Sequence, residues 1–169
     1  MVKEQSLVLI KPDAIVKSLT GNIMSVLSEL KLKIVGAKMV RVHKELAEIH
    51  YERHKGKSFY EELINYLTGN LNFHTNRVLA LVYEGENAIN TIREHVGDKN
   101  PELAHPSTIR GKYGRIDSKT GVFENVVHAS DTPEEAEREI KLWFSPGELA
   151  SVIYPVEEKE VTKKEKVWK

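Results

Sequence analysis

The side chains best suited to chemistry are one histidine, three cations and one carboxylate, at His128, Lys11, Arg93, Arg110 and Glu139. A neutral imidazole has a free ring nitrogen near neutral pH, so it can act as a nucleophile and accept a phosphoryl group. A lysine ammonium and two planar guanidinium groups are suited to holding phosphate oxygens. The chain has no glycine-rich phosphate-binding motif, so side chains must bind any phosphate. These residue types indicate phosphate chemistry centred on a histidine.

His128 ends an apolar run and precedes the start of a helix. Residues 125–128 read Asn-Val-Val-His, and residues 130–133 are typical of a helix N-terminus. The pattern predicts a strand over 122–128 with His128 at its carboxyl end, a position where α/β sheets bind ligands. The alternative is an ordinary core histidine, which residue type alone does not exclude.

Glu139 occupies a position that helical periodicity reserves for the core. Ala136, Glu139, Ile140 and Trp143 stand at i, i+3, i+4 and i+7 of a helix expected to begin at Pro133. A carboxylate on that face needs a partner, and His128 is the nearest candidate in the sequence. Their pairing would fix the imidazole tautomer and raise its nucleophilicity. In the alternative, Glu139 reaches solvent at the edge of the apolar stripe.

The elements that must position these residues alternate between strands and helices. Lys11 follows a short apolar run, residues 6–10, that is typical of a strand buried on both faces. The spacing of apolar residues and the positions of glycine and proline predict the elements that follow. These are a helix at 20–30, a strand at 34–42, a helical hairpin at 44–67, a loop at 68–76, a strand at 78–83, a helix at 88–96 and a long loop at 98–121. A capping box at Ser58 is expected to start the second helix of the hairpin. This order predicts an α+β, ferredoxin-like (split βαβ) fold, a four-stranded antiparallel sheet with helices on one side.

Composition limits the remaining possibilities. At 169 residues we expect a single domain over residues 1–155 and a charged tail over 156–169, in which Trp168 could make an anchoring contact. Lysine plus arginine and aspartate plus glutamate each number 25, so no global field attracts nucleic acid or a membrane. The absence of cysteine excludes disulfides and thiolate chemistry. No apolar run approaches membrane-spanning length, and we expect a soluble, cytoplasmic protein.

Two other functions have weak support in the sequence. Ferredoxin-like sheets also bind RNA, and residues 111–114 faintly resemble an aromatic RNA-reading motif, but they lie in a glycine-punctuated loop. His50 and His54 are spaced i, i+4 on an expected helix, as metal ligands are. No third ligand or suitably placed glutamate accompanies them.

Several separate motifs resemble those of the nucleoside diphosphate kinase family. Residues 125–131 are similar to its active-site signature, residues 9–13 to its first-strand motif and residues 108–111 to the arginine turn before its catalytic strand. Shorter similarities lie at His50-Tyr51, Phe59 with Leu63, Glu84-Gly85, Asn100-Pro101 and residues 142–144. The resemblance covers residues 6–154 in order, and agreement of several motifs is stronger than any one of them.

The resemblance implies a ping-pong reaction. The γ-phosphoryl group of a nucleoside triphosphate would pass to His128 and then to a nucleoside diphosphate. Lys11 and Asn125 would bind the ribose 3′-hydroxyl and the phosphate region, and Arg93 and Arg110 the phosphates. Magnesium is expected on the phosphates, held by substrate oxygens and water rather than by protein ligands.

The resemblance also assigns supporting roles. Tyr51 would support Lys11, while Ser130 and Glu139 would orient the histidine. Phe59 would stack on the base and Val122 would close the other side of that clamp, an arrangement that tolerates every base because each offers a π-face.

The chain departs from the family pattern at three places. Lys99 stands where the family usually has threonine, and it would meet phosphate as a charge rather than a hydroxyl. The chain is longer than usual at residues 70–77 and between 110 and 125, and the second insertion falls in a loop that packs between subunits of family hexamers.

A homohexamer is expected, with a tetramer or dimer left open. An inactive nucleotide-binding or regulatory relative is the alternative function.

Overall fold

The computed structural model describes residues 3–71 and 73–160, and its centre is a four-stranded antiparallel sheet. The strands are β1 (Lys3–Ile10), β2 (Lys33–Arg41), β3 (Arg77–Glu86) and β6 (Val127–Ala129), in the order β2-β3-β1-β6. β1 lies between β3 and β6, which explains why its apolar residues are buried on both faces. The strand order is that of the split βαβ fold, so the predicted ferredoxin-like α+β fold is confirmed.

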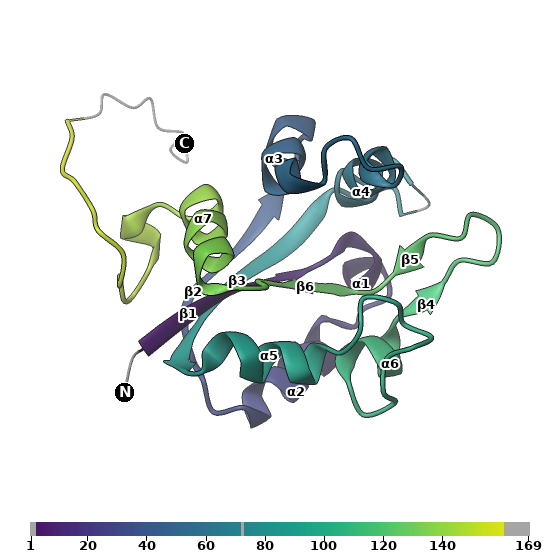
Figure 1. Cartoon of the computed structure of the whole chain (residues 1–169), viewed down its shortest axis with the longest axis horizontal. Coiled ribbons are helices and arrows are strands. Elements are labelled where there is room, and N and C mark those ends of the chain that lie inside the picture. Colours follow the sequence, from purple (N-terminus) through teal and green to yellow (C-terminus); the bar gives the residue numbers. More distant parts are fainter. Residues whose placement is uncertain (1–2, 72, 161–169) are drawn as a thin grey trace, which may run out of the picture.

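Helices cover both faces of the sheet, so the expectation of helices on one side is wrong (Figure 1). The short α1 (Pro12–Val16), with α2 (Thr20–Glu29) and α5 (Ala88–Val96), packs on one face. The other face is covered by α3 (Lys44–His50), η1 (Glu52–His54), α4 (Tyr60–Leu67) and α7 (Pro133–Trp143), followed by η2 (Pro146–Glu148). Because the inserted α3–α4 hairpin and the last helix both carry apolar stripes, each needs a sheet face to bury them.

The start and the buried face of α7 agree with its sequence, whereas the start of α4 does not. In α7 the Thr132 hydroxyl accepts a hydrogen bond from the Glu135 amide, and Pro133 occupies the first turn. The buried residues of α7 are Ala136, Glu139, Ile140 and Trp143. The capping box predicted at Ser58 is wrong, because α4 begins at Tyr60 without a side-chain cap.

The segment before His128 is more ordered than the sequence indicates. The expected loop contains α6 (Ile109–Tyr113) and a hairpin of β4 (Arg115–Ile116) with β5 (Phe123–Glu124), a separate two-stranded sheet. The predicted continuous strand over 122–128 is wrong. Val126 interrupts it with a φ of 58°, held because its amide donates to Asp13 Oδ2 and its carbonyl accepts from the Lys11 amide. The sequence gives no indication of this interruption, because a β-branched residue such as valine strongly disfavours positive φ.

The C-terminal segment runs along the sheet before it leaves the domain. Buried Glu84 accepts hydrogen bonds from the side chains of Gln5 and Ser151. Of the charged tail expected at 156–169, residues 156–160 are exposed, and residues 161–169, with Trp168, lie outside the described residues. No helix of the described residues is both long and apolar enough to cross a membrane.

Gly69 closes the turn after α4 in a conformation that no other residue fits. Its φ is +75°, and a Cβ atom there would lie 2.1 Å from the carbonyl oxygen of Thr75. This close approach joins the end of α4 to the start of β3.

We predict that Gly69→Ala lowers the free energy of unfolding by about 1–3 kcal/mol, because positive φ and the clash with Thr75 both oppose a side chain. Gly21→Ala in α2 is the matched control, since a Cβ there meets nothing within 4 Å. It should be neutral or stabilising by about 1 kcal/mol at most. Urea denaturation of both variants measures the difference, and equal stabilities would contradict the prediction.

Candidate active site

His128 lies on β6 with one ring nitrogen held by a buried carboxylate. Its side chain is 16% exposed, and Nε2 lies 2.9 Å from Glu139 Oε1. The Ser130 hydroxyl donates to the other Glu139 oxygen at 2.6 Å and accepts from the Leu7 amide of β1. The contact between His128 and Glu139 predicted from helical periodicity is therefore present. Because a carboxylate only accepts, Nε2 carries the hydrogen and a neutral ring has its lone pair on Nδ1.

The Glu139 carboxylate stays ionised despite its burial. Burial raises the pKa of Glu139, but the nearby imidazole of His128, with hydrogen bonds from His128 and Ser130, outweighs this and brings the pKa to about 2. The carboxylate is therefore negative throughout the neutral range.

His50 is a neighbour of His128 that the sequence did not lead us to expect. It is buried, its ring centroid lies 4.6 Å from that of His128, and the Trp143 indole donates to its Nδ1 at 3.2 Å. Burial, and then the charge of His128, lowers the pKa of His50 well below its usual value. His50 is thus a neutral ring against which His128 packs. The one sequence feature that could have indicated this position is the resemblance of the His50-Tyr51 pair to the family.

Lys11 follows β1 and is buried beside Asn125. Its Nζ donates to Asn125 Oδ1 at 2.8 Å, while Asn125 Nδ2 donates to the Lys99 carbonyl at 2.9 Å. Burial, together with the positive charge of Arg110, lowers the pKa of Lys11 to about 7. The ammonium therefore lies in a setting that disfavours its charge until an anion arrives.

Arg110 is fixed by backbone carbonyls at the start of α6. Its two terminal nitrogens donate to the carbonyls of Gly97 and Val127, each at 3.0 Å. Its Nε is buried and has no partner within the described residues. Burial, and then the charge of Arg93, lowers the pKa of Arg110 to about 10, so it remains cationic at neutral pH. A rigid guanidinium without a carboxylate partner in this part of the chain is a site for an anion.

Arg93, on α5, forms an ion pair that sequence reasoning did not foresee. Its partner is Asp131, which also pairs with Arg53 of η1. Arg53 further pairs with Glu135 at 3.3 Å. Because Arg93 and Asp131 are about 45% and 38% exposed, this pair contributes little to stability. Phosphate oxygens can therefore compete with Asp131 for the Arg93 guanidinium.

The remaining predicted residues lie around this cluster with different contacts. Phe59 is 43% exposed at the start of α4, where its ring centroid lies 5.7 Å from that of His54 and 5.8 Å from the Lys57 ammonium. Tyr51 is buried against His50. In the described chain Tyr51 makes no hydrogen bond to Lys11, whose Nζ instead lies 4.8 Å from the ring centroid of Tyr66.

Lys99 and Val122 are placed less directly at the site. Lys99 holds Asn125 through its backbone carbonyl, and its side chain is exposed. Val122 is buried at the β4–β5 hairpin, where its carbonyl accepts from the Asp117 amide. Neither position tests the predicted contacts with a nucleotide.

Comparison with known proteins agrees with this geometry. The family model described as nucleoside diphosphate kinase matches residues 4–149. The chain is 48% identical over 146 residues to the nucleoside diphosphate kinase of Pyrococcus furiosus, covering 86% of each chain. The chain belongs to the nucleoside diphosphate kinase family. As a kinase of this family it transfers a phosphoryl group between nucleotides, which favours an active enzyme over an inactive relative.

Solved structures of nucleoside diphosphate kinases share the fold. The Borrelia burgdorferi enzyme, described as a transition-state mimic with bound vanadate and ADP, aligns with a TM-score of 0.80 at 30% identity, covering 91% of this chain and 94% of that one. The Halobacterium salinarum enzyme in complex with CDP aligns with a TM-score of 0.76 at 34% identity, covering 90% and 95%.

We predict that binding of a nucleoside diphosphate at pH 8 takes up about one proton, because phosphate oxygens raise the pKa of a largely neutral Lys11. The uptake should fall as the pH drops below about 6, where Lys11 is already charged. Calorimetry in buffers of different ionisation enthalpy measures the protons. Lys11→Arg stays charged and should take up none, so equal uptake by the variant would contradict the assignment.

Proposed function

We propose that this chain carries the phosphoryl group on Nδ1 of His128. The observation that supports this is the contact of Nε2 with Glu139, which leaves Nδ1 as the ring atom with a free lone pair. The ring is partly exposed, so a substrate can reach it.

In the first half-reaction the Nδ1 lone pair attacks the γ-phosphorus of a nucleoside triphosphate. The new N–P bond forms as the bond to the bridging oxygen breaks, and the electron pair leaves on the nucleoside diphosphate. The imidazole becomes positive, and the ionised Glu139 stabilises it through Nε2–H. In the second half-reaction a terminal oxygen of another diphosphate attacks the phosphohistidine, and the neutral ring is restored.

We propose that the buried cations stabilise the charge of the transferring group. Lys11 and Arg110 lack carboxylate partners within the described residues, and both lie at the site without side-chain freedom to reorganise. Arg93 would leave Asp131 for phosphate oxygens, while Lys11 and Asn125 would also contact the ribose 3′-hydroxyl. Preorganised cations of this kind supply most of the catalysis in phosphoryl transfer.

We propose that the base stacks on Phe59 and that Val122 closes the opposite side. Ser130 and Glu139 orient His128, Tyr51 lies behind the site, and Lys99 adds a positive charge near the phosphates. The vanadate and ADP bound by one relative and the CDP bound by another support nucleotide binding by this fold.

Nucleotide kinases work with a divalent cation on the phosphates, and we propose Mg²⁺ here. His50, His128 and Glu139 offer three ligand atoms within 4.8 Å of one another, but two imidazoles suit zinc better than magnesium. Asp131 and Glu139 are already engaged by arginines, a histidine and a serine. Magnesium would therefore be held by substrate oxygens and water, where it neutralises phosphate charge.

We propose a single catalytic domain over residues 1–155 followed by a charged tail over 156–169. The homohexamer, with a tetramer or dimer as alternatives, stays a prediction, as does the cytoplasmic location.

We predict that a nucleoside triphosphate labelled at the γ-phosphate, supplied without acceptor, leaves acid-labile label on the chain. A nucleoside diphosphate added afterwards should remove it, because the phosphohistidine is the intermediate of both half-reactions. His128→Ala should retain none. A chain that binds nucleotide yet takes no label would instead be an inactive relative, and label on His128→Ala would contradict the assignment of the nucleophile.

We predict that Glu139→Gln lowers kcat about a hundredfold with little change in KM, because the amide no longer balances charge on the imidazole. Glu137→Gln, on the same helix but paired with Lys141, is the matched control and should keep full activity. Steady-state kinetics separates the two. A rise in KM alone would assign Glu139 to substrate binding rather than to positioning His128.

A further inference from the structure

A second group of cations lies at the end of the sheet, outside the residues assigned to catalysis. Arg41 ends β2, Arg77 begins β3, and the two are directly opposite in the antiparallel ladder. Directly opposite residues project from the same face with Cβ atoms about 5 Å apart. Two like charges at this spacing destabilise a sheet unless a negative group lies between them.

Neither arginine has an acidic partner in residues 3–71 and 73–160. Arg77 makes one side-chain hydrogen bond, from Nε to the Thr75 hydroxyl at 3.3 Å, and both arginine side chains are exposed. Most of their guanidinium N–H groups are thus available to an incoming acceptor.

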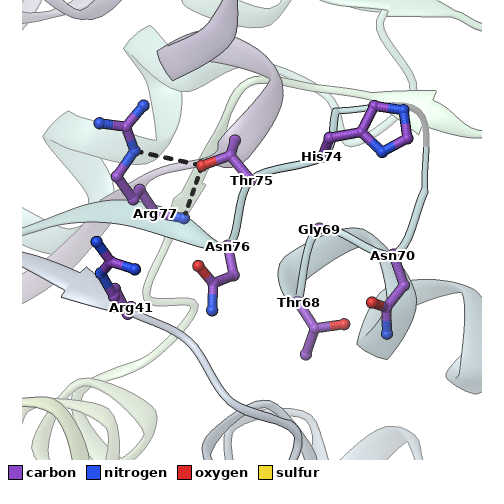
Figure 2. A pocket seen from close by; sticks show the side chains of 8 residues that line it. All are labelled: Arg41, Thr68, Gly69, Asn70, His74, Thr75, Asn76 and Arg77. Carbon is purple, nitrogen blue, oxygen red and sulfur yellow. Dashed lines mark hydrogen bonds between the residues drawn. The ribbon is translucent and has the colours of Figure 1, made fainter.

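The two arginines form one side of a pocket of about 560 Å³ (Figure 2). The amides of Asn70 and Asn76 and the hydroxyls of Thr68 and Thr75 line the rest of it, with Gly69 and His74. Among the described residues the lining includes no aliphatic side chain and no Phe, Tyr or Trp. The Thr68 hydroxyl and the Asn76 amide already donate to backbone carbonyls, so the donors open to a ligand are mainly those of the two guanidinium groups. The lining has no apolar platform on which a base could stack.

The pocket wall is held in place by backbone contacts. Gly69 packs against Thr75, and the Asn76 side chain donates to the Val42 carbonyl at 2.9 Å while the Val42 amide donates to the Asn76 carbonyl at 2.8 Å. His74 adopts a positive φ of 49°.

We propose that Arg41 and Arg77 form a second binding site for phosphate groups, separate from the catalytic site. Planar guanidinium forks pair with phosphate oxygens, and a negative group between them relieves their mutual repulsion. The number of donors exceeds what one carboxylate accepts and suits linked phosphates, either inorganic pyrophosphate or the polyphosphate end of a nucleotide. The nucleoside would remain outside the pocket.

Phenylglyoxal modification of arginines, read by peptide mass spectrometry, tests the site residue by residue on the full chain. Pyrophosphate should slow modification of Arg41 and Arg77 about fivefold or more, because bound anion blocks both guanidinium groups. Arg115, which pairs with Glu124 on the β4–β5 hairpin, is the internal reference and should be unaffected. Because the readout is local, anion binding at the catalytic site does not influence it.

Variants test whether the two arginines act together. In Arg41→Gln the protection of Arg77 should be lost, whereas Lys33→Gln, at the other end of β2, should keep it. The double variant Arg41→Gln/Arg77→Gln should retain the wild-type turnover number, since neither residue belongs to the catalytic cluster.

Comparing anions identifies the source of the phosphate. Equal protection by pyrophosphate and by a nucleoside triphosphate supports recognition of the phosphates alone, and stronger protection by the triphosphate supports a nucleotide as the ligand. Equal protection by citrate at matched ionic strength would overturn the assignment to phosphate. Absence of protection, or arginines that fail to react even without anion, would overturn the site itself.

Discussion

The burial of the Glu139 carboxylate is the constraint on which the active site depends. A buried charge carries a penalty of several kcal/mol unless it is paired and hydrogen-bonded. Here His128 and Ser130 satisfy both oxygens, and Ser130 in turn accepts from the backbone of β1. The same contacts join α7 to β6 and β1 and select the tautomer of the histidine. Fold stability and nucleophile orientation therefore share one small network.

The cations of the site show the opposite arrangement. Lys11 and Arg110 are held by an amide oxygen and by backbone carbonyls, which fix their positions without cancelling their charge. A chain with zero formal net charge thus brings together two basic side chains that, within the described residues, have no carboxylate hydrogen-bond partner. Burial is the main cause that lowers the pKa of both groups; the charge of Arg110 adds to the effect on Lys11, and the charge of Arg93 adds to the effect on Arg110. An anion bound beside these groups would offset that penalty.

Backbone strain occurs where the strand expected before His128 is interrupted. Val126 has a positive φ two residues before His128, and Asp13 and Lys11 hold its backbone through hydrogen bonds. The interruption separates the short β6 from the β4–β5 hairpin and lets Asn125 face Lys11. Strained backbone of this kind persists only when its surroundings over-determine it. The sequence of residues 122–128 predicts one continuous strand, but its interruption at Val126 is what places Asn125 beside Lys11.

The sequence by itself determined the order of strands and helices along the chain, the core-facing position of Glu139 and the catalytic role expected of His128. These follow from local periodicity, capping and residue type, which act over a few positions. Only the tertiary structure decided that helices cover both faces, that His50 packs on His128, that Asp131 engages Arg93 and Arg53, and that Arg41 lies opposite Arg77. Each of these depends on contacts between residues distant in the chain, which local patterns do not encode.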